Sequence, residues 1–339
     1  MKESTEHGFS RREFLAGTSL LGAATFLGLP RMAAAEPPPE ITKIRVVQSE
    51  SICVAPSYLA EELLRLEGFA EVEYVKYLGG QASSVLAAGR ADITMQTVPG
   101  LILQIDAGEP VVLISGVHAG CYELFTNQRI QSVRDLKGRP VAVSAIGDDD
   151  HIFLASIMAY VGMDPRTDIE WITTKTRGES LRMFVEGKVD AFLAFPPQPQ
   201  ELRAKKIGHV IVNTTLDRPW SQYFCCIVAA RRGFVHENPN ATKRALRAIL
   251  KAADICAQEP ERAARLLVAK GYEPRYEIGL EVLKSLPYNR WRESSAEDSL
   301  RFHALRLHEA GLIKSTPQQI IAKGSDWRFL NELKKELKT

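Results

Sequence analysis

The 339-residue sequence lacks the marks of several common protein classes. No apolar run reaches the ~18–20 residues that a membrane-spanning helix needs. Five cysteines are too few for a disulfide-built scaffold. With 43 basic and 41 acidic residues, the chain has no charge excess from which to build a broad basic face, so we expect no nucleic-acid partner. What remains is an ordinary globular composition, with a length that suggests two compact units.

Short catalytic motifs are also missing. The sequence has no Gly-x-Ser-x-Gly elbow, no P-loop, no Gly-x-Gly-x-x-Gly and no His-Glu-x-x-His. These absences count against hydrolase, ATPase, dehydrogenase and metalloprotease activity. We therefore expect no enzyme activity, no catalytic residue and no cofactor.

The N-terminus has the features of an export signal. Arg11 and Arg12 lie in a short segment that resembles the twin-arginine (Tat) motif, and an apolar segment follows. Ala33 and Ala35 fit an A-x-A cleavage site. We predict that residues 1–35 are a signal peptide that the Tat translocase exports and that is cleaved, leaving the mature chain in the periplasm. The alternative is a short amphipathic helix with a chance arginine pair.

All five cysteines follow the predicted cleavage site, and we expect them to be buried thiols. Cys225 and Cys226 are adjacent in a predicted strand, so their side chains should point to opposite faces. His118 and Cys121 lie close together, but the sequence nominates no further ligands for a metal ion. We therefore expect no metal site. The cysteines are Cys53, Cys121, Cys225, Cys226 and Cys256.

An internal repeat at an offset of 98 residues predicts the architecture. Gly80 is followed by a Gly89-Arg-Ala-Asp92 turn, and Gly178 by a Gly187-Lys-Val-Asp190 turn at the same spacing. In each copy a β-rich run precedes the first glycine, a segment with helical spacing follows it, and a second β-rich run follows the turn. Such alternation predicts an α/β fold with two similar lobes, each an open parallel sheet with helices on both faces.

Ligands of open α/β sheets bind outside the carboxyl ends of the strands. The two copies therefore nominate three loops each, and all six line one cleft if the lobes face each other. These loops span residues 49–56, 79–82, 96–99, 145–150, 177–180 and 194–197.

The pattern changes after residue 213. Residues 223–230 have the composition of a strand, and the rest of the chain is mostly helical. The chain must then cross between the lobes twice, near residues 118–122 and 215–223. We predict one lobe from residues 36–118 plus 222–339 and a second from residues 119–221.

Several of these segments resemble one known family. The segments are residues 51–60, the two repeat turns, the Val133-Arg-Asp-Leu-Lys-Gly-Arg-Pro-Val141 stretch, Phe195-Pro196-Pro197 and residues 326–330. In order and spacing they are similar to the substrate-binding proteins of ABC importers for nitrate, aliphatic sulfonates, taurine and thiamine-pyrimidine precursors.

The resemblance implies a type II, two-lobed periplasmic binding protein, or Venus flytrap, with a helical C-terminal segment. It also implies a monomer without catalysis that closes on a small-molecule ligand and delivers it to an ABC permease in the inner membrane. The chain lacks the cysteine-cluster motif of the pyrimidine-synthesising relatives. Two alternatives stay open: a Tat-exported enzyme with a bound cofactor, and a ligand-sensing module without an importer.

Three consecutive carboxylates, Asp148, Asp149 and Asp150, affect which ligands can bind. They either cap a helix or contact a cationic or hydrogen-bond-donating ligand, and in the second case they would repel a sulfonate or nitrate. Arg177 either binds a ligand carboxylate or neutralises these aspartates. The full set of predicted ligand-binding residues is Ser49, Ser51, Gly80, Gln81, Gln96, Thr97, His118, Asp148, Asp149, Asp150, Arg177, Phe195, Trp220 and Tyr223.

The signal assignment gives a first prediction. Replacing both Arg11 and Arg12 with Lys keeps the charge but removes the guanidinium groups, which Lys cannot replace. We expect the double variant to accumulate as uncleaved precursor in the cytoplasm, measured by cell fractionation. Periplasmic protein at the wild-type level would contradict the signal assignment.

Overall fold

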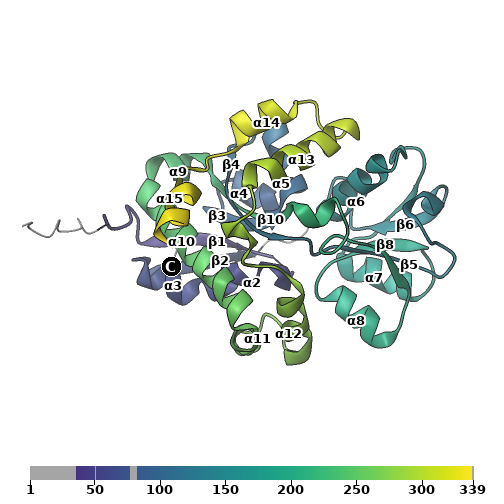
Figure 1. Ribbon diagram of the computed structural model, residues 1–339, viewed down its shortest axis with the longest axis horizontal. Helices are drawn as coiled ribbons and strands as arrows, with labels where there is room; N and C mark the ends of the chain where they lie inside the picture. Colours follow the sequence, from purple (N-terminus) through teal and green to yellow (C-terminus); the bar gives the residue numbers. More distant parts are fainter. Residues whose placement is uncertain (1–35, 50, 77–81, 338–339) are drawn as a thin grey trace, which may run out of the picture. The chain divides into compact units, whose positions relative to one another are not determined.

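Two five-stranded mixed sheets organise the chain (Figure 1). The computed structural model describes residues 36–49, 51–76 and 82–337, and the described residues from Pro38 onward form one unit. The predicted signal residues Arg11, Arg12, Ala33 and Ala35 therefore lie outside the described residues, as do Gly80 and Gln81.

The first sheet has the order β2-β1-β3-β10-β4 and the second has the order β7-β6-β8-β5-β9. Their shared order reflects the repeat in the sequence. The first sheet contains β1 (Lys43–Gln48), β2 (Glu71–Lys76), β3 (Ile93–Thr97), β4 (Val111–Ala119) and β10 (Phe224–Arg231). The second contains β5 (Glu123–Thr126), β6 (Pro140–Val143), β7 (Glu170–Thr173), β8 (Ala191–Ala194) and β9 (His209–Asn213).

The expectation of purely parallel sheets was wrong at one strand in each sheet. β10 pairs antiparallel with β3 and β4, and β5 pairs antiparallel with β8 and β9. Both strands directly follow a crossing between the sheets. The chain therefore enters each of them from the direction opposite to the parallel strands.

Helices flank both sheets, and Figure 1 shows α6, α7 and α8 beside β5, β6 and β8. Before β10 the helices are α2 (Ala55–Leu59), α3 (Glu61–Leu66), α4 (Ala82–Ala87), α5 (Val98–Asp106), α6 (Asp149–Tyr160), α7 (Arg177–Val185) and α8 (Gln198–Lys205). After β10 they are α9 (Arg232–Glu237), α10 (Pro239–Gln258), α11 (Pro260–Ala269), α12 (Tyr276–Ser285), α13 (Ala296–Glu309), α14 (Pro317–Gly324) and α15 (Arg328–Glu336). Short 3-10 turns span Ile52–Val54, Val133–Leu136, Trp220–Gln222 and Arg290–Arg292.

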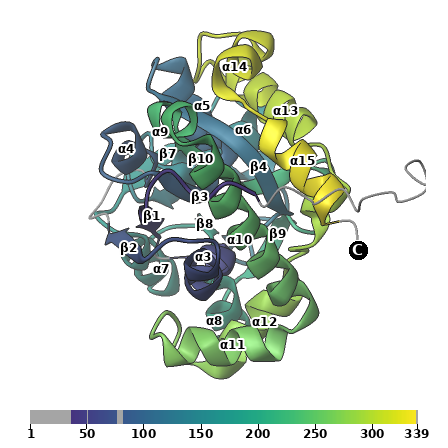
Figure 2. The same cartoon turned by 90° about the vertical axis from the view of Figure 1, so that its left-hand side faces the viewer.

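The C-terminal segment is helical, as predicted, and Figure 2 shows α13, α14 and α15 along one side. Helix α14 begins with a capping box, because the Thr316 side chain accepts from the backbone of Gln319 while the Gln319 side chain accepts from that of Thr316. The N-cap of α13 is Ser295, whose side chain accepts from the backbone N–H of Asp298. Among the described residues, no helix has both the length and the apolarity to cross a bilayer.

The repeated Gly-Arg/Lys-x-Asp turns have a structural role. Gly89 and Gly187 adopt left-handed φ angles of 70° and 69°, which glycine reaches without strain. The Asp92 carboxylate accepts hydrogen bonds from the backbone and guanidinium of Arg45 on β1. Asp190 accepts from Asn127 and Arg129 in the loop after β5. The motif thus fastens each turn to a neighbouring segment.

The two crossings between the sheets lie side by side. The Thr214 hydroxyl accepts hydrogen bonds from the backbone N–H groups of Cys121 and Tyr122, at 3.2 and 2.9 Å. The Thr214 N–H donates to the Tyr122 carbonyl at 2.9 Å. A Cβ on Gly120, whose φ is +63°, would lie 2.3 Å from the Thr215 Cα. The close approach of the crossings therefore requires glycine at position 120.

This contact gives a second prediction. Gly120→Ala should destabilise the fold by about 2–4 kcal/mol, because left-handed strain adds to a backbone clash. Gly138→Ala is the matched control: Gly138 has φ +71° but nothing within 4 Å of its Cβ position. It should lose only about 1–2 kcal/mol. Urea denaturation measures both, and equal losses would contradict the importance of the crossing contact.

Candidate ligand-binding site

A pocket lies where the strand ends of both sheets converge, and its empty volume is about 350 Å³, including space open to solvent. Five of the six predicted loops contribute residues to it, while the remaining loop, 79–82, lies largely outside the described residues. The lining residues are Ser49, Ser51, Cys53, Val54, Met95, Gln96, Thr97, Cys121, Tyr122, Asp149, Arg177, Phe195 and Cys226.

Asp149 is the buried charge of this pocket, with 5% of its surface exposed in the first turn of α6. Its carboxylate packs against Gly100 in the first turn of α5, where a Cβ would lie 2.1 Å from Oδ1. Burial raises the pKa of Asp149, and the positive charge of Arg177 partly opposes that shift. The first sheet's α5 and the second sheet's α6 thus meet at this carboxylate.

Arg177 lies opposite the carboxylate at the start of α7, where Thr176 is the N-cap. Its guanidinium donates to Asp149 Oδ2 at 3.4 Å and lies over the Phe195 ring, 4.4 Å from the centroid. The Gln198 side-chain amide donates a hydrogen bond to the Arg177 carbonyl at 2.9 Å. The pocket therefore contains a nearly neutral pair of opposite charges, with the cation placed on an aromatic face.

Three buried oxygens of the pocket lining have no hydrogen-bond partner among the described residues. They are Gln96 Oε1, Asp149 Oδ1 and Thr97 Oγ1. The Gln96 amide already donates to Asp149 Oδ2 at 3.4 Å. Buried polar atoms are usually paired, so the Gln96 and Asp149 oxygens, which only accept, are suited to a ligand that donates hydrogen bonds, and the Thr97 hydroxyl can either donate or accept.

The three aspartates turn out to have three different environments. Asp150 is buried and accepts hydrogen bonds from the backbone and hydroxyl of Ser144, at 2.8 and 2.7 Å. Asp148 is the N-cap of α6, but its side chain makes no capping hydrogen bond. Burial raises the pKa of Asp148, and the neighbouring Asp150 charge adds to this shift. Only Asp149 lines the pocket.

The serines of the first loop connect the two halves of the pocket. The Ser51 hydroxyl is within 3.2 Å of the Pro196 carbonyl, which belongs to the loop after β8 in the second sheet. Ser51 also caps the 3-10 turn through the Cys53 N–H. The Ser49 carbonyl accepts from the Tyr58 hydroxyl. Ser51 is thus a direct contact across the pocket.

All five cysteines are buried free thiols, as expected. The prediction that Cys225 and Cys226 point to opposite faces was wrong. The register of β10 against β4 shifts on both sides of Cys226, and their sulfurs lie within 4.8 Å of each other and of Cys121. Hydrogen bonds from the Cys121 and Cys226 thiols lower the pKa of Cys53, whereas burial raises that of Cys225.

His118 does not line the pocket, contrary to the sequence-based expectation. It is fully buried on β4, where its ring packs edge-on against Tyr288 at 5.1 Å. Its position near the crossing indicated a cleft residue, but β4 continues to Ala119 and carries it into the core.

Trp220 and Tyr223 are also absent from the pocket lining. Trp220 packs against Phe153, Phe302 and Tyr160, and Tyr223 stacks on Phe302 at 4.0 Å. Helix α13, which supplies Phe302, covers the second crossing and takes up both rings. Tyr122 and Phe195 are the aromatic residues of the pocket, and sequence reasoning missed Tyr122 although it lies in the predicted crossing.

Two lobes of the same topology, with a pocket between their strand ends, define the class of two-lobed solute-binding proteins. Comparison with known proteins gives the family. The sequence profile of the NMT1/THI5-like family matches residues 57–263, well over half of the chain. The chain belongs to this family.

One curated relative is the bicarbonate-binding protein CmpA of Synechococcus elongatus. It is 28% identical over 110 residues, which are 32% of this chain and 24% of CmpA. CmpA of a second Synechococcus strain is 27% identical over the same length. The matched region is thus about a quarter of each relative.

Solved structures confirm the two-lobed α/β fold. The periplasmic nitrate-binding protein NrtA of Synechocystis superposes with a TM-score of 0.73 and 17% identity, over 89% of this chain and 90% of NrtA. The alkanesulfonate-binding protein SsuA of Xanthomonas axonopodis, bound to MOPS, gives a TM-score of 0.71 and 16% identity, over 87% of this chain and all of SsuA. At this identity the likeness concerns the fold.

The core beneath the site gives a pH prediction. Burial lowers the pKa of His303 from 6.5 to about 4, although a hydrogen bond to the Phe224 carbonyl opposes the shift. As the pH falls, the unfolded chain therefore protonates His303 at a higher pH than the folded chain does. Stability should fall as pH drops from about 6.5 to 4, by on the order of 3 kcal/mol, and this contribution stays constant below pH 4.

Replacing His303 with Gln should flatten that pH dependence, because glutamine does not titrate. Urea denaturation across the pH range measures the slope. His308→Gln is the control, because His308 lies on the exposed face of the same helix. A His303→Gln slope equal to that of the wild type would overturn the assignment.

Proposed function

We propose that this protein is the solute-binding component of an ABC importer. It captures a small organic molecule between its two lobes and delivers it to a permease in the inner membrane. The observation that carries the proposal is the Asp149–Arg177 pair, buried in a pocket that loops of both lobes line. Family membership supports a solute-binding role. The Tat signal would place the protein in the periplasm, where such a component works.

The proposed mechanism is closure of the lobes around the ligand. We assign residues 36–118 and 222–339 to one lobe and residues 119–221 to the other, with a hinge at 118–122 and 215–223. Two contacts across this division support a closed form. Besides the contact of Ser51 with Pro196, Arg275 forms an ion pair with Glu201 of α8 at 2.7 Å. Ligand binding would favour this form by adding contacts to both lobes.

The chemistry of the pocket favours a ligand that donates hydrogen bonds. A simple anion near Asp149 meets a like charge, which costs on the order of 1 kcal/mol or more at ~4–6 Å. Arg177 cannot fully compensate, because it already pairs with Asp149 at 3.4 Å. A neutral, zwitterionic or amine-bearing planar molecule would donate to Asp149 and Gln96 and pack against Tyr122 or Phe195. Three thiols line the pocket beside Asp149. We propose binding rather than catalysis because the nitrate-binding and sulfonate-binding proteins that share the fold are binding proteins.

A ligand screen tests this proposal. Purified protein should show a raised melting temperature with a small amine-bearing or zwitterionic compound, and little change with nitrate, bicarbonate or taurine. Asp149→Asn should weaken binding of the stabilising compound about 10- to 100-fold, because it removes a buried charged acceptor. Asp148→Asn is the control and should bind like the wild type, since Asp148 does not line the pocket.

The opposite outcomes are equally clear. Strong stabilisation by nitrate, bicarbonate or taurine would overturn the proposed ligand chemistry. Unchanged selectivity in Asp149→Asn would remove Asp149 from the site. A catalysed conversion of the compound would replace the binding proposal with an enzyme.

A further inference from the structure

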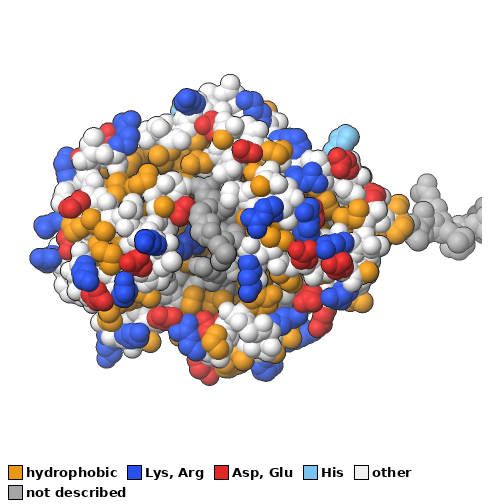
Figure 3. All heavy atoms as spheres, turned by 180° about the vertical axis from the view of Figure 1, so that it is seen from behind, with side chains coloured by type: hydrophobic (Ala, Val, Ile, Leu, Met, Phe, Trp, Pro, Cys, Tyr) orange, Lys and Arg blue, Asp and Glu red, His pale blue; other side chains and the backbone are white. Residues whose placement is uncertain are grey.

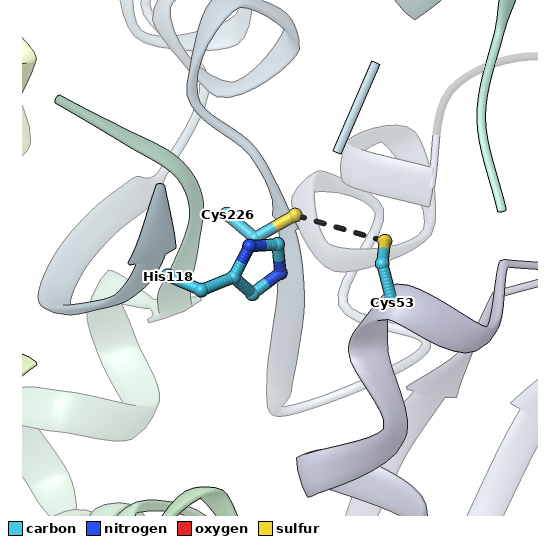
Figure 4. A group of neighbouring side chains, drawn as sticks. All are labelled: Cys53, His118 and Cys226. Carbon is cyan, nitrogen blue, oxygen red and sulfur yellow. Dashed lines mark hydrogen bonds between the residues drawn. The ribbon is translucent and has the colours of Figure 1, made fainter. Parts of the chain in front are cut away.

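Four of the five cysteines gather with His118 in one buried cluster. We call Cys53, Cys121, Cys225, Cys226 and His118 the thiol cluster. Its members come from the 3-10 turn after β1, the end of β4, the first crossing and the start of β10. Figure 4 shows the His118 imidazole and the thiols of Cys53 and Cys226 turned toward one another. Segments far apart in the sequence thus bring four cysteine sulfurs and one imidazole together.

The distances between these atoms suit a single metal ion. The sulfurs of Cys53 and Cys226 are 4.0 Å apart, and those of Cys121 and Cys225 are 3.3 Å apart. Two triads, Cys53-His118-Cys226 and Cys121-Cys225-Cys226, each have ligand atoms within 4.8 Å of one another. Sulfurs bound to one zinc ion at ~2.3 Å stand ~3.8 Å apart in a tetrahedron. The observed separations therefore bracket the value that a shared ion requires.

His118 is oriented as a metal-binding histidine. Its Nδ1 lies 2.9 Å from the Gly120 carbonyl, and a carbonyl can only accept, so Nδ1 carries the proton. Nε2 then has a free lone pair, and it has no hydrogen-bond partner among the described residues although the side chain is fully buried. Holding one ring nitrogen on a carbonyl is how proteins orient the other toward a metal.

We propose that the thiol cluster binds one thiophilic metal ion, Zn²⁺ or Cu⁺, with Cys226 as the ligand common to both triads. Thiolate and imidazole ligands select such ions over Mg²⁺ and Ca²⁺, which prefer oxygen. Binding releases the thiol protons, because the thiolate is the ligand. Cys53, Cys121 and Cys226 also line the pocket, so the ion lies at the pocket wall. The proposal depends on this cluster and not on the importer function.

Metal titration of the reduced, exported protein tests it. Zn²⁺, and Cu⁺ in competition with a chromogenic chelator, should each bind at one equivalent per chain, measured by native mass spectrometry. Mg²⁺ should not bind at the cluster. Cys226→Ala should lower the affinity at least ~100-fold, beyond the 10- to 100-fold that loss of a supporting group costs. The matched control is Cys256→Ala, which removes a buried thiol outside the cluster and should leave binding unchanged.

A further pair of variants keeps the test decisive if Cys226→Ala folds poorly. Cys53→Ala and Cys225→Ala each remove one ligand from a single triad, and the more damaging of the two identifies the coordinating triad. If Cys53→Ala is the more damaging variant, His118→Gln should also weaken binding while circular dichroism stays that of the wild type. Failure of the reduced wild type to bind either ion would overturn the proposal. So would a Cys121–Cys225 disulfide found by thiol counting in the exported protein, or a Cys226→Ala variant with wild-type affinity.

Discussion

The hydroxyl and backbone of Thr214 hold the two chain crossings together, and the rest of the site depends on this contact. It fixes Cys121 and Tyr122 at the point where the sheets meet. Because β5 leaves and β10 re-enters at this point, the strand ends of both sheets face the same space. A Cβ at position 120 would clash with the backbone of Thr215, so glycine at this position sets how closely the two crossings approach.

Electrostatics within the pocket follow from that placement. Figure 3 shows basic and acidic side chains interspersed over one face of the molecule. Inside the pocket, the Asp149 carboxylate and the Arg177 guanidinium form a buried pair, with side-chain exposures of 5% and 15%. A buried pair stabilises little by itself, because desolvation offsets attraction, so its position at a converging pocket is better explained by recognition.

The sequence predicts most of the fold but only part of the binding site. The 98-residue repeat identifies both sheets and five contributing loops, because glycine turns and strand ends have local signals. Local signals could not identify the antiparallel strands, which depend on where the chain crosses. They also could not assign Trp220 and Tyr223 to the core, because α13, which buries them, lies some 80 residues later in the chain. The aspartate run shows the same limit, since one residue of three faces the pocket.

The bulge in β10 connects the pocket with the thiol cluster. A regular strand would place Cys225 and Cys226 on opposite faces, and the cluster would lose one of them. The register shift at Cys226 instead lets one thiol line the pocket while its neighbour reaches Cys121. Bulges often re-aim side chains next to functional sites. The irregularity, which no periodicity in the sequence indicates, thus adds the thiol of Cys226 to a pocket lining that already holds Cys53 and Cys121.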